Sequence, residues 1–167
     1  KSIAAVAYLK SVDHDENVHI GFVLGKAKLA PTHGHTLPRL ELCAAVLAIE
    51  IAEVVRESLD FPASNFTYHT DSKVVLGYIY NNSRRFYNYV SNRVDRIKHA
   101  SKSTDWCHVK TEDNPADLGT RSVSVETLQD SSWLQGPNCL RQTVNLDDSN
   151  EQFPMIEPNQ DKEVRSC

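Results

Sequence analysis

The sequence predicts a mixed α/β fold in which helices cover the faces of a sheet. Two apolar segments, residues 2–9 and 18–24, are separated by a polar turn and predict an antiparallel pair of strands. A long helical pattern follows over residues 37–59, and strand patterns then alternate with helical ones. Hairpin strands followed by alternating elements are typical of a mixed sheet flanked by helices.

Residues 37–59 have the clearest helical pattern, after residues 26–30, which we expect to be extended. Thr36 is the expected N-cap, and Pro38 is tolerated in the first turn. The expected apolar stripe contains Leu40, Leu47, Ile51, Val54 and Val55. We place Glu41 in the first turn, where an acid either interacts favourably with the helix dipole or is held as a functional carboxylate at the sheet surface.

The stretch from Phe66 to Ile79 reads as a strand that runs directly into a helix. Ser72 is a plausible N-cap, and Asp71 precedes it at the carboxyl end of the strand. Functional groups gather at this end of strands in open α/β sheets. An acid before a helix is also commonly just part of a cap, so both interpretations stay open at this point.

The second half of the chain predicts a helix over residues 86–100 and a short strand over 105–109. Asn114 and Pro115 suit the N-cap and first position of another helix, which puts Asp117 in its first turn. Residues 126–141 predict either a short helix or an extended segment that carries Trp133.

Length and composition indicate one domain with a tail. The chain has 167 residues, of which 40% are hydrophobic, and no run of 18 apolar residues predicts a membrane span. It opens in mid-pattern without a signal peptide, so we expect it to be part of something longer. The four cysteines form no CxxC pair, which favours reduced thiols over disulfides or zinc.

Charge is distributed unevenly along the chain. Residues 145–167 hold six acids and two bases, a composition that predicts a disordered acidic tail. Residues 81–99 hold five Lys or Arg residues against one acid. Such a basic patch is expected of a surface that contacts a phosphate backbone, although an ordinary solvated helix face has the same composition.

Three carboxylates, those of Glu41, Asp71 and Asp117, each lie where a helix is expected to begin. Clustered carboxylates repel one another unless a cation compensates their charge, and their hard oxygen atoms suit Mg²⁺ or Mn²⁺. Two such ions can activate a water and stabilise a leaving oxygen in phosphodiester cleavage. Physical chemistry allows this interpretation without selecting it.

Four motifs, in this order and spacing, resemble the ribonuclease H region of BEL/Pao-type LTR retrotransposon polyproteins. They are Leu-Pro-Arg-Leu-Glu-Leu-Cys-Ala-Ala (37–45), Thr-Asp-Ser-Lys-Val-Val-Leu-Gly-Tyr-Ile (70–79), Arg-Arg-Phe with Val-Ser-Asn-Arg-Val (84–94) and Asn-Pro-Ala-Asp-Leu (114–118). The resemblance implies a ribonuclease H-like domain over 1–122, a connecting segment toward an integrase over 123–144, and the acidic tail over 145–167.

The resemblance implies two-metal hydrolysis of the RNA strand of RNA–DNA hybrids, with Mg²⁺ or Mn²⁺ held by Glu41, Asp71 and Asp117, and Asn114 as a structural cap. The family's first strand and its Asp are expected before Lys1, so we expect this chain alone to be nearly inactive and the parent polyprotein to be the enzyme. Cellular relatives also carry a His near the position of Thr111, whereas His108 is expected to be structural.

Nucleic-acid contacts are predicted at Lys73, Arg84, Arg85 and Arg93, because hybrid recognition rests on phosphates and 2′-hydroxyls. Tyr87 and Tyr89 are expected in the core rather than stacked on bases. The implied partners are the RNA–DNA hybrid and the adjacent reverse transcriptase and integrase domains, with no membrane. The implied location is a cytoplasmic virus-like particle, the nucleus or both.

Two other functions compete with a nuclease. A catalytically dead relic would keep the fold and a nucleic-acid-binding or scaffold role. A Pao-type peptidase rests on a label that this family also carries, and the Asp-Ser/Thr-Gly motif of aspartic peptidases is absent, because Lys73 follows Asp71-Ser72.

Overall fold

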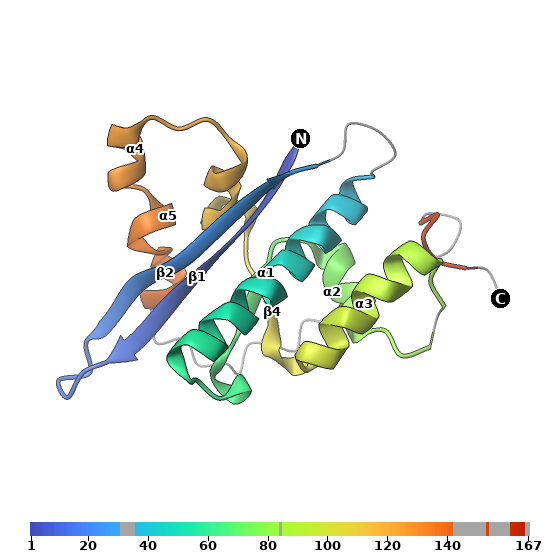
Figure 1. The fold of residues 1–167 in the computed structure, drawn as a ribbon, viewed down its shortest axis with the longest axis horizontal. Helices are drawn as coiled ribbons and strands as arrows, with labels where there is room; N and C mark the ends of the chain where they lie inside the picture. Colours follow the sequence, from blue (N-terminus) through green and yellow to red (C-terminus); the bar gives the residue numbers. More distant parts are fainter. Residues whose placement is uncertain (31–35, 84, 142–152, 154–160, 166–167) are drawn as a thin grey trace.

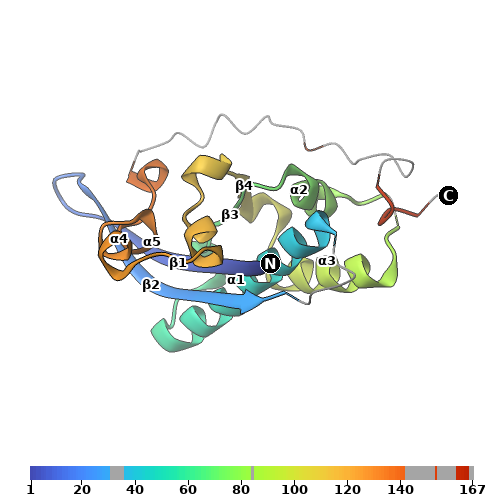
Figure 2. The same ribbon diagram turned by 90° about the horizontal axis from the view of Figure 1, so that it is seen from above.

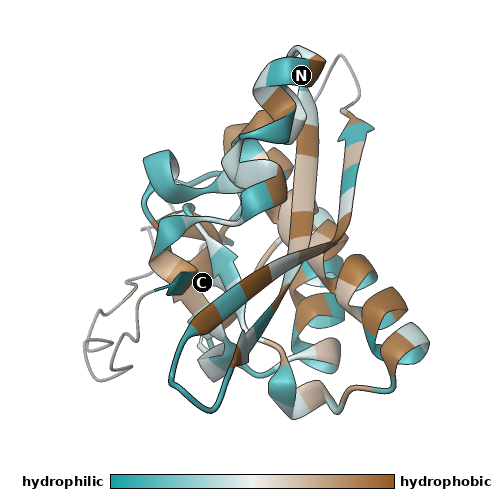
Figure 3. Cartoon of the chain, turned by 90° about the vertical axis from the view of Figure 1, so that its left-hand side faces the viewer, coloured by the Kyte–Doolittle hydropathy of each residue, from teal (hydrophilic) through white to brown (hydrophobic). Residues whose placement is uncertain are grey.

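A computed structural model describes residues 1–30, 36–83, 85–141, 153 and 161–165. The chain begins with a long antiparallel hairpin made of β1 (Ser2–Val12) and β2 (Val18–Leu29), with an irregularity in register between Ala7 and Tyr8. The expected strand over 18–24 and the expected extended segment are therefore one strand. Figure 3 shows β1 hydrophobic near the N-terminus, whereas hydrophilic bands interrupt β2.

Helix α1 (Leu37–Leu59) has the predicted bounds. The hydroxyl oxygen of Thr36 accepts from the backbone N–H of Arg39, and Asp60 ends the helix in a left-handed conformation with φ of 54°. The first turn contains no acid, so the placement of Glu41 there is wrong by about one residue. Val54 is 52% exposed and does not belong to the buried stripe.

Helix α1 is buried on two sides rather than along one stripe. One face contributes Leu47, Ile51 and Val55 to a small cluster with the hairpin. The other face contributes Leu42, Ala45 and Ile49 to the main core. Figure 1 shows the hairpin on one side of α1 and helices α2 (Lys73–Tyr80) and α3 (Asn88–Ala100) on the other. The sequence pattern captured the hairpin side and missed the helix side.

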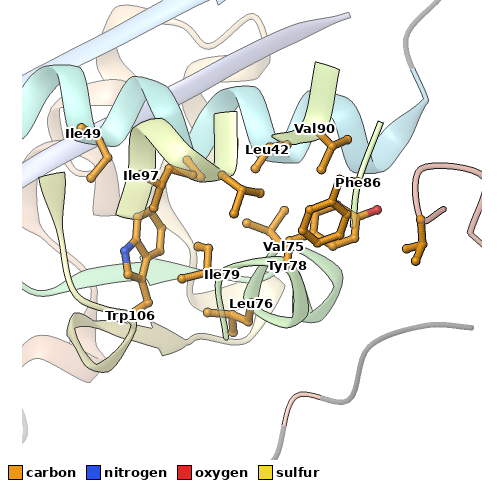
Figure 4. Packing of buried hydrophobic residues seen from close by; sticks show 13 residues of the cluster. Leu42, Ile49, Val75, Leu76, Tyr78, Ile79, Phe86, Val90, Ile97 and Trp106 are labelled. Carbon is orange, nitrogen blue, oxygen red and sulfur yellow. The ribbon is translucent and has the colours of Figure 1, made fainter. Parts of the chain in front are cut away.

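The main core lies between α1, α2, α3 and a second, parallel pair of strands. These are β3 (Tyr68–Thr70) and β4 (Trp106–His108). Figure 4 shows the fully buried Trp106 at one end of the core and Tyr78 with Phe86 at the other. In the described part of the chain, β1 pairs only with β2 and β3 only with β4.

The remaining elements are short. They are the 3₁₀ helices η1 (Ala63–Asn65), η2 (Ser103–Asp105), η3 (Thr111–Asp113), η4 (Pro115–Thr120) and η5 (Asn138–Arg141), and the α-helices α4 (Val125–Gln129) and α5 (Ser132–Gln135). The helix expected after Asn114 is thus 3₁₀ rather than α. Figure 1 shows α4 and α5 across the hairpin from α1. The hydroxyl of Tyr8 donates to the carbonyl oxygens of Ser132 and Trp133.

Trp133 is the main anchor of α5. Its ring fills the space beside Gly25 of β2 and Gly119 of η4, where an added Cβ would overlap the indole. The expected connecting segment therefore packs on the hairpin, while the domain division itself stays a prediction. No helix among the described residues is long and apolar enough to cross a membrane.

Residues 161–165 pack against the body of the protein, which differs from the disorder expected for 145–167. Val164 is 3% exposed and joins the main core, where it forms a bridge with Phe86. Figure 2 shows this segment beside α3. Composition alone misses such a contact, because a few buried residues suffice to hold a short segment. Apart from Phe153, the rest of the expected tail lies outside the described residues.

Candidate functional site

Glu41 and Asp71 form a carboxylate pair at the junction of α1 with the carboxyl end of β3. Ser72 begins α2 as its N-cap, because its Oγ accepts from the backbone N–H of Val75 at 3.2 Å. The same hydroxyl donates to Oε2 of Glu41 at 2.5 Å. Ser72 is only 5% exposed, so one buried hydroxyl both starts α2 and fixes Glu41 beside Asp71.

The charge of Glu41 is disfavoured in this position. Burial raises the pKa of Glu41, and the neighbouring Asp71 carboxylate raises it further, while the hydrogen bond from Ser72 acts in the opposite direction. Desolvated carboxylates beside a like charge are typical of sites that bind a cation or carry out acid–base chemistry. The pair is therefore a candidate functional site.

Asp117 lies in the first turn of η4, as predicted, and Asn114 is its cap. The side-chain oxygen of Asn114 accepts from the backbone N–H of Ala116 at 3.1 Å. The Asp117 carboxylate is 38% exposed and bonds Nη2 of Arg121 at 3.1 Å. Within the described part of the chain, no group of three or more His, Cys, Asp or Glu side chains could hold one metal ion. The site formed by all three carboxylates stays a prediction.

A second charged region, which we call the arginine–tyrosine cluster, contains Arg39, Tyr89 and Arg93. The guanidinium carbon of Arg39 lies 4.7 Å from the centroid of the Tyr89 ring, and that of Arg93 lies 3.6 Å from it. Burial and the neighbouring Cys43 raise the pKa of Tyr89 to about 12. The predicted core position of Tyr89 holds in part. Its ring packs against the core, but the guanidinium groups of Arg39 and Arg93 also lie against it.

Residues 161–165 cover one side of this cluster. Arg39 donates from Nε and Nη2 to the two carboxylate oxygens of Glu163 at 2.6 and 3.0 Å. The side chain of Glu163 is 6% exposed, so this is a nearly buried bidentate ion pair. The hydroxyl of Tyr78 donates to Asp161. Burial is the main cause that raises the pKa of Tyr78, and this hydrogen bond adds to it.

The other predicted nucleic-acid contacts are exposed or lie outside the described residues. Lys73 is exposed at the first position of α2, and Arg85 is exposed before α3, whereas Arg84 lies outside the described residues. A pocket of about 430 Å³ lies beside Arg85. Its polar lining includes Asn81, Asn82, Asn88, Lys98 and Arg165. Tyr87 is 50% exposed, which corrects its expected core position.

Sequence reasoning missed Arg39, Tyr78, Asp161 and Glu163. Arg39 stood inside a quoted motif but was not singled out, although a cation two residues before a candidate carboxylate is a usable signal. Tyr78 was placed among the apolar helical residues. The two acids were counted only as part of a disordered composition, and nothing local in the sequence pairs them with residues 83 and 124 positions away.

Comparison with known families indicates what the first part of the chain is similar to. Residues 1–72 match the family model described as the Pao retrotransposon-like RNaseH-like domain. Residues 1–72 are therefore similar to an RNaseH-like domain. This confirms the resemblance found from the motifs, and the mixed α/β architecture is consistent with an RNase H-like fold.

The match to the RNaseH-like family includes the carboxylate pair and Ser72, and it ends at that residue. Asp117, Arg85 and Arg93 lie beyond the matched residues, so their roles rest on the motifs and on the geometry above. Searches of the curated proteins and of the solved structures found no match.

Proposed function

We propose that this RNaseH-like domain binds RNA–DNA hybrids and, within its polyprotein, contributes Glu41 and Asp71 to a divalent-cation site that hydrolyses the RNA strand. The observation that carries the proposal is the position of Ser72, whose buried hydroxyl holds Glu41 beside Asp71. No cation among the described contacts neutralises this pair, so a bound metal ion would relieve its repulsion.

The donor set suits Mg²⁺ or Mn²⁺, because both prefer hard oxygen ligands. When bound, two such ions supply an activated water and stabilisation of the leaving oxygen. The chain's own part is to present the two carboxylates and to orient Glu41 through Ser72. Second-shell hydrogen bonds of this kind typically change metal affinity by about 10–100-fold.

Exposed cations of the domain suit the hybrid backbone. Arg85 and Lys73 are exposed, and Arg85 lines a polar pocket with Lys98. These cations offer sequence-independent phosphate contacts, so hybrid affinity should fall as salt rises and weaken in Arg84→Ala and Arg85→Ala. A hybrid affinity that stays constant from low to moderate salt would contradict this part of the proposal.

A second function, hybrid binding without cleavage, is favoured by one observation. Asp117 is partly exposed and bound by Arg121 rather than grouped with the carboxylate pair. A domain that keeps the basic surface but does not assemble all three carboxylates would bind nucleic acid as a scaffold. Both functions place the domain beside reverse transcriptase and integrase domains, in a cytoplasmic particle or the nucleus.

The deciding experiment measures cation binding first and cleavage second. Thermal unfolding of the 167-residue chain in Mn²⁺ or Mg²⁺ should show stabilisation of about 2.7 kcal/mol at a cation concentration of 100 times Kd. Glu41→Gln should abolish most of this gain. Glu57→Gln is the matched control, because Glu57 is exposed on the same helix and the substitution is chemically identical.

Cleavage is then assayed with the parent polyprotein and a labelled hybrid, with Asp71→Asn as the inactive reference. Cation-dependent cleavage lost in Asp71→Asn supports the nuclease. Salt-dependent hybrid binding without cleavage supports the scaffold function. No binding of either cation or hybrid would reject both.

A further inference from the structure

Residues 161–165, which we call the strap, are held by main-chain hydrogen bonds, an ion pair and a buried side chain. Its main chain pairs with the loop before α3: the N–H of Tyr87 donates to Glu163 O at 3.1 Å, and the N–H of Arg165 donates to Arg85 O at 2.9 Å. Val164 is buried against Phe86. This short antiparallel pairing around a buried side chain is how an extended peptide binds to a groove.

The side chains of the strap are sorted by charge. Asp161 and Glu163 are 7% and 4% exposed and face the body, whereas Lys162 and Arg165 are exposed. The strap is therefore neutral as a whole but acidic on its inner side. Glu163 takes both donors of the Arg39 fork, which is the geometry that a phosphate of nucleic acid would use.

The surface beneath the strap adjoins two of the predicted nucleic-acid contacts. Arg39 shares the Tyr89 ring with Arg93, and the main chain of the strap bonds to Arg85. Both Arg93 and Arg85 are predicted nucleic-acid contacts. A carboxylate and a phosphate cannot occupy the same guanidinium fork at once, so the two ligands must compete.

We propose that the strap is an intramolecular competitor of nucleic acid: Asp161 and Glu163 occupy a phosphate-binding surface centred on Arg39, and hybrid binds there when the strap is displaced. This inference rests on the proposed function, because it assigns a regulation to the same hybrid-binding domain. The apparent Kd of the hybrid is then the intrinsic Kd divided by the fraction of molecules with the strap open.

Val164→Asp gives the sharpest test. A charge at this buried position should expel the strap, and the substitution also adds a negative charge to the protein. Simple electrostatics therefore predicts weaker hybrid binding, whereas release of the competitor predicts binding about fivefold tighter or more. Val125→Asp is the matched control, since Val125 is 69% exposed in α4.

A second variant changes charge without disturbing the core. The double variant Asp161→Asn and Glu163→Gln removes the inner acids and should also tighten hybrid binding. Its control, Asp15→Asn with Glu57→Gln, changes the net charge equally at two exposed positions. In the Val164→Asp background, Arg39→Ala should remove the gain in affinity, because the released guanidinium is the proposed phosphate ligand.

Hydrogen exchange reports the strap directly. Saturating hybrid should speed exchange at the amide of Arg165, which is bonded to Arg85 in the closed state. Fluorescence anisotropy with a labelled hybrid at low salt measures the affinities. Tighter binding of both released variants, with faster exchange, supports the inference. Equal binding by wild type and both variants overturns it and leaves the proposed function intact, whereas no hybrid binding by any protein overturns both.

Discussion

Two carboxylates near the beginning of α1 have opposite environments. Glu163 is nearly buried, but Arg39 binds both of its oxygens. Glu41 is only two positions from Arg39 along α1, yet among the described residues its hydrogen-bond partner is the neutral hydroxyl of Ser72, and its neighbour is the like-charged Asp71. A compensated carboxylate holds structure together, whereas an uncompensated pair is suited to bind a cation.

The largest effect is expected from removing the cation of the compensated pair. Loss of one partner from a buried ion pair typically costs about 3–5 kcal/mol. In Arg39→Met the strap can detach from the body of the protein. The loss of stability therefore cannot exceed the free energy with which the strap binds to the body. We expect fast exchange of the Arg165 amide while the core stays protected, measured by hydrogen exchange.

Lys28→Met is the matched control for that substitution. Lys28 pairs with Glu50 at 2.7 Å, but both side chains are about 40% exposed, so the loss should stay below about 1 kcal/mol. Retained protection of the strap in Arg39→Met would show that Glu163 does not depend on its cation, and the comparison would fail.

The next effect concerns the neutral partner of Glu41. Ser72→Ala removes the N-cap of α2 and leaves the Glu41 carboxylate without its donor, at an expected cost of about 1–3 kcal/mol in urea unfolding. Ser124→Ala removes an exposed cap from α4 and should cost less. Equal losses in the two variants would mean that the Ser72–Glu41 bond contributes little.

A pH-dependent effect distinguishes the uncompensated pair. Because the folded protein raises the pKa of Glu41, its protonated form stabilises the fold at pH values below the unfolded pKa, and this stability is lost as pH rises through the folded pKa. Glu41→Gln should therefore be more stable than wild type at pH 7 and similar to it near pH 4. Melting temperatures across this range, with Glu57→Gln as reference, measure the difference.

The smallest effect on stability is expected at Asp117. Its exposed pair with Arg121 should contribute less than about 0.5 kcal/mol, so Asp117→Asn should unfold with a nearly unchanged midpoint. Because the stability of Asp117→Asn is expected to be unchanged, any loss of cleavage by the parent polyprotein would reflect the chemical step rather than folding. Strong loss of cleavage at constant stability would place Asp117 with the carboxylate pair, and unchanged cleavage would exclude it.

Local sequence patterns predicted the elements that local interactions determine. The bounds of α1, its Thr36 cap and the Ser72 cap follow from propensity and capping chemistry, and all three are confirmed. Glu41 and Asp71 were also singled out, because each was expected next to a helix start, and their role in a cation site stays a prediction. The pattern of α1 failed where burial depends on tertiary packing, since one apolar stripe cannot reveal a helix covered on two sides.

The strap could not be predicted in the same way. Its acids pair with Arg39 and Tyr78 over more than 80 positions of sequence, and its composition resembles a solvated tail. The alternation of acids and bases in residues 161–165 was visible, but only the structure shows that the acids face inward. Non-local contacts of this kind leave no periodic signal in a single sequence.

The close packing of Trp133 against two glycines predicts how these positions vary among relatives. A side chain at Gly119 would put its Cβ 2.5 Å from Cζ3 of the indole, and one at Gly25 would overlap the same ring. Gly119 is two residues from Asp117, so a bulky replacement would shift the 3₁₀ turn that carries this acid. Among relatives, the three positions should therefore vary together: wherever a larger residue replaces either glycine, a smaller one should replace the tryptophan.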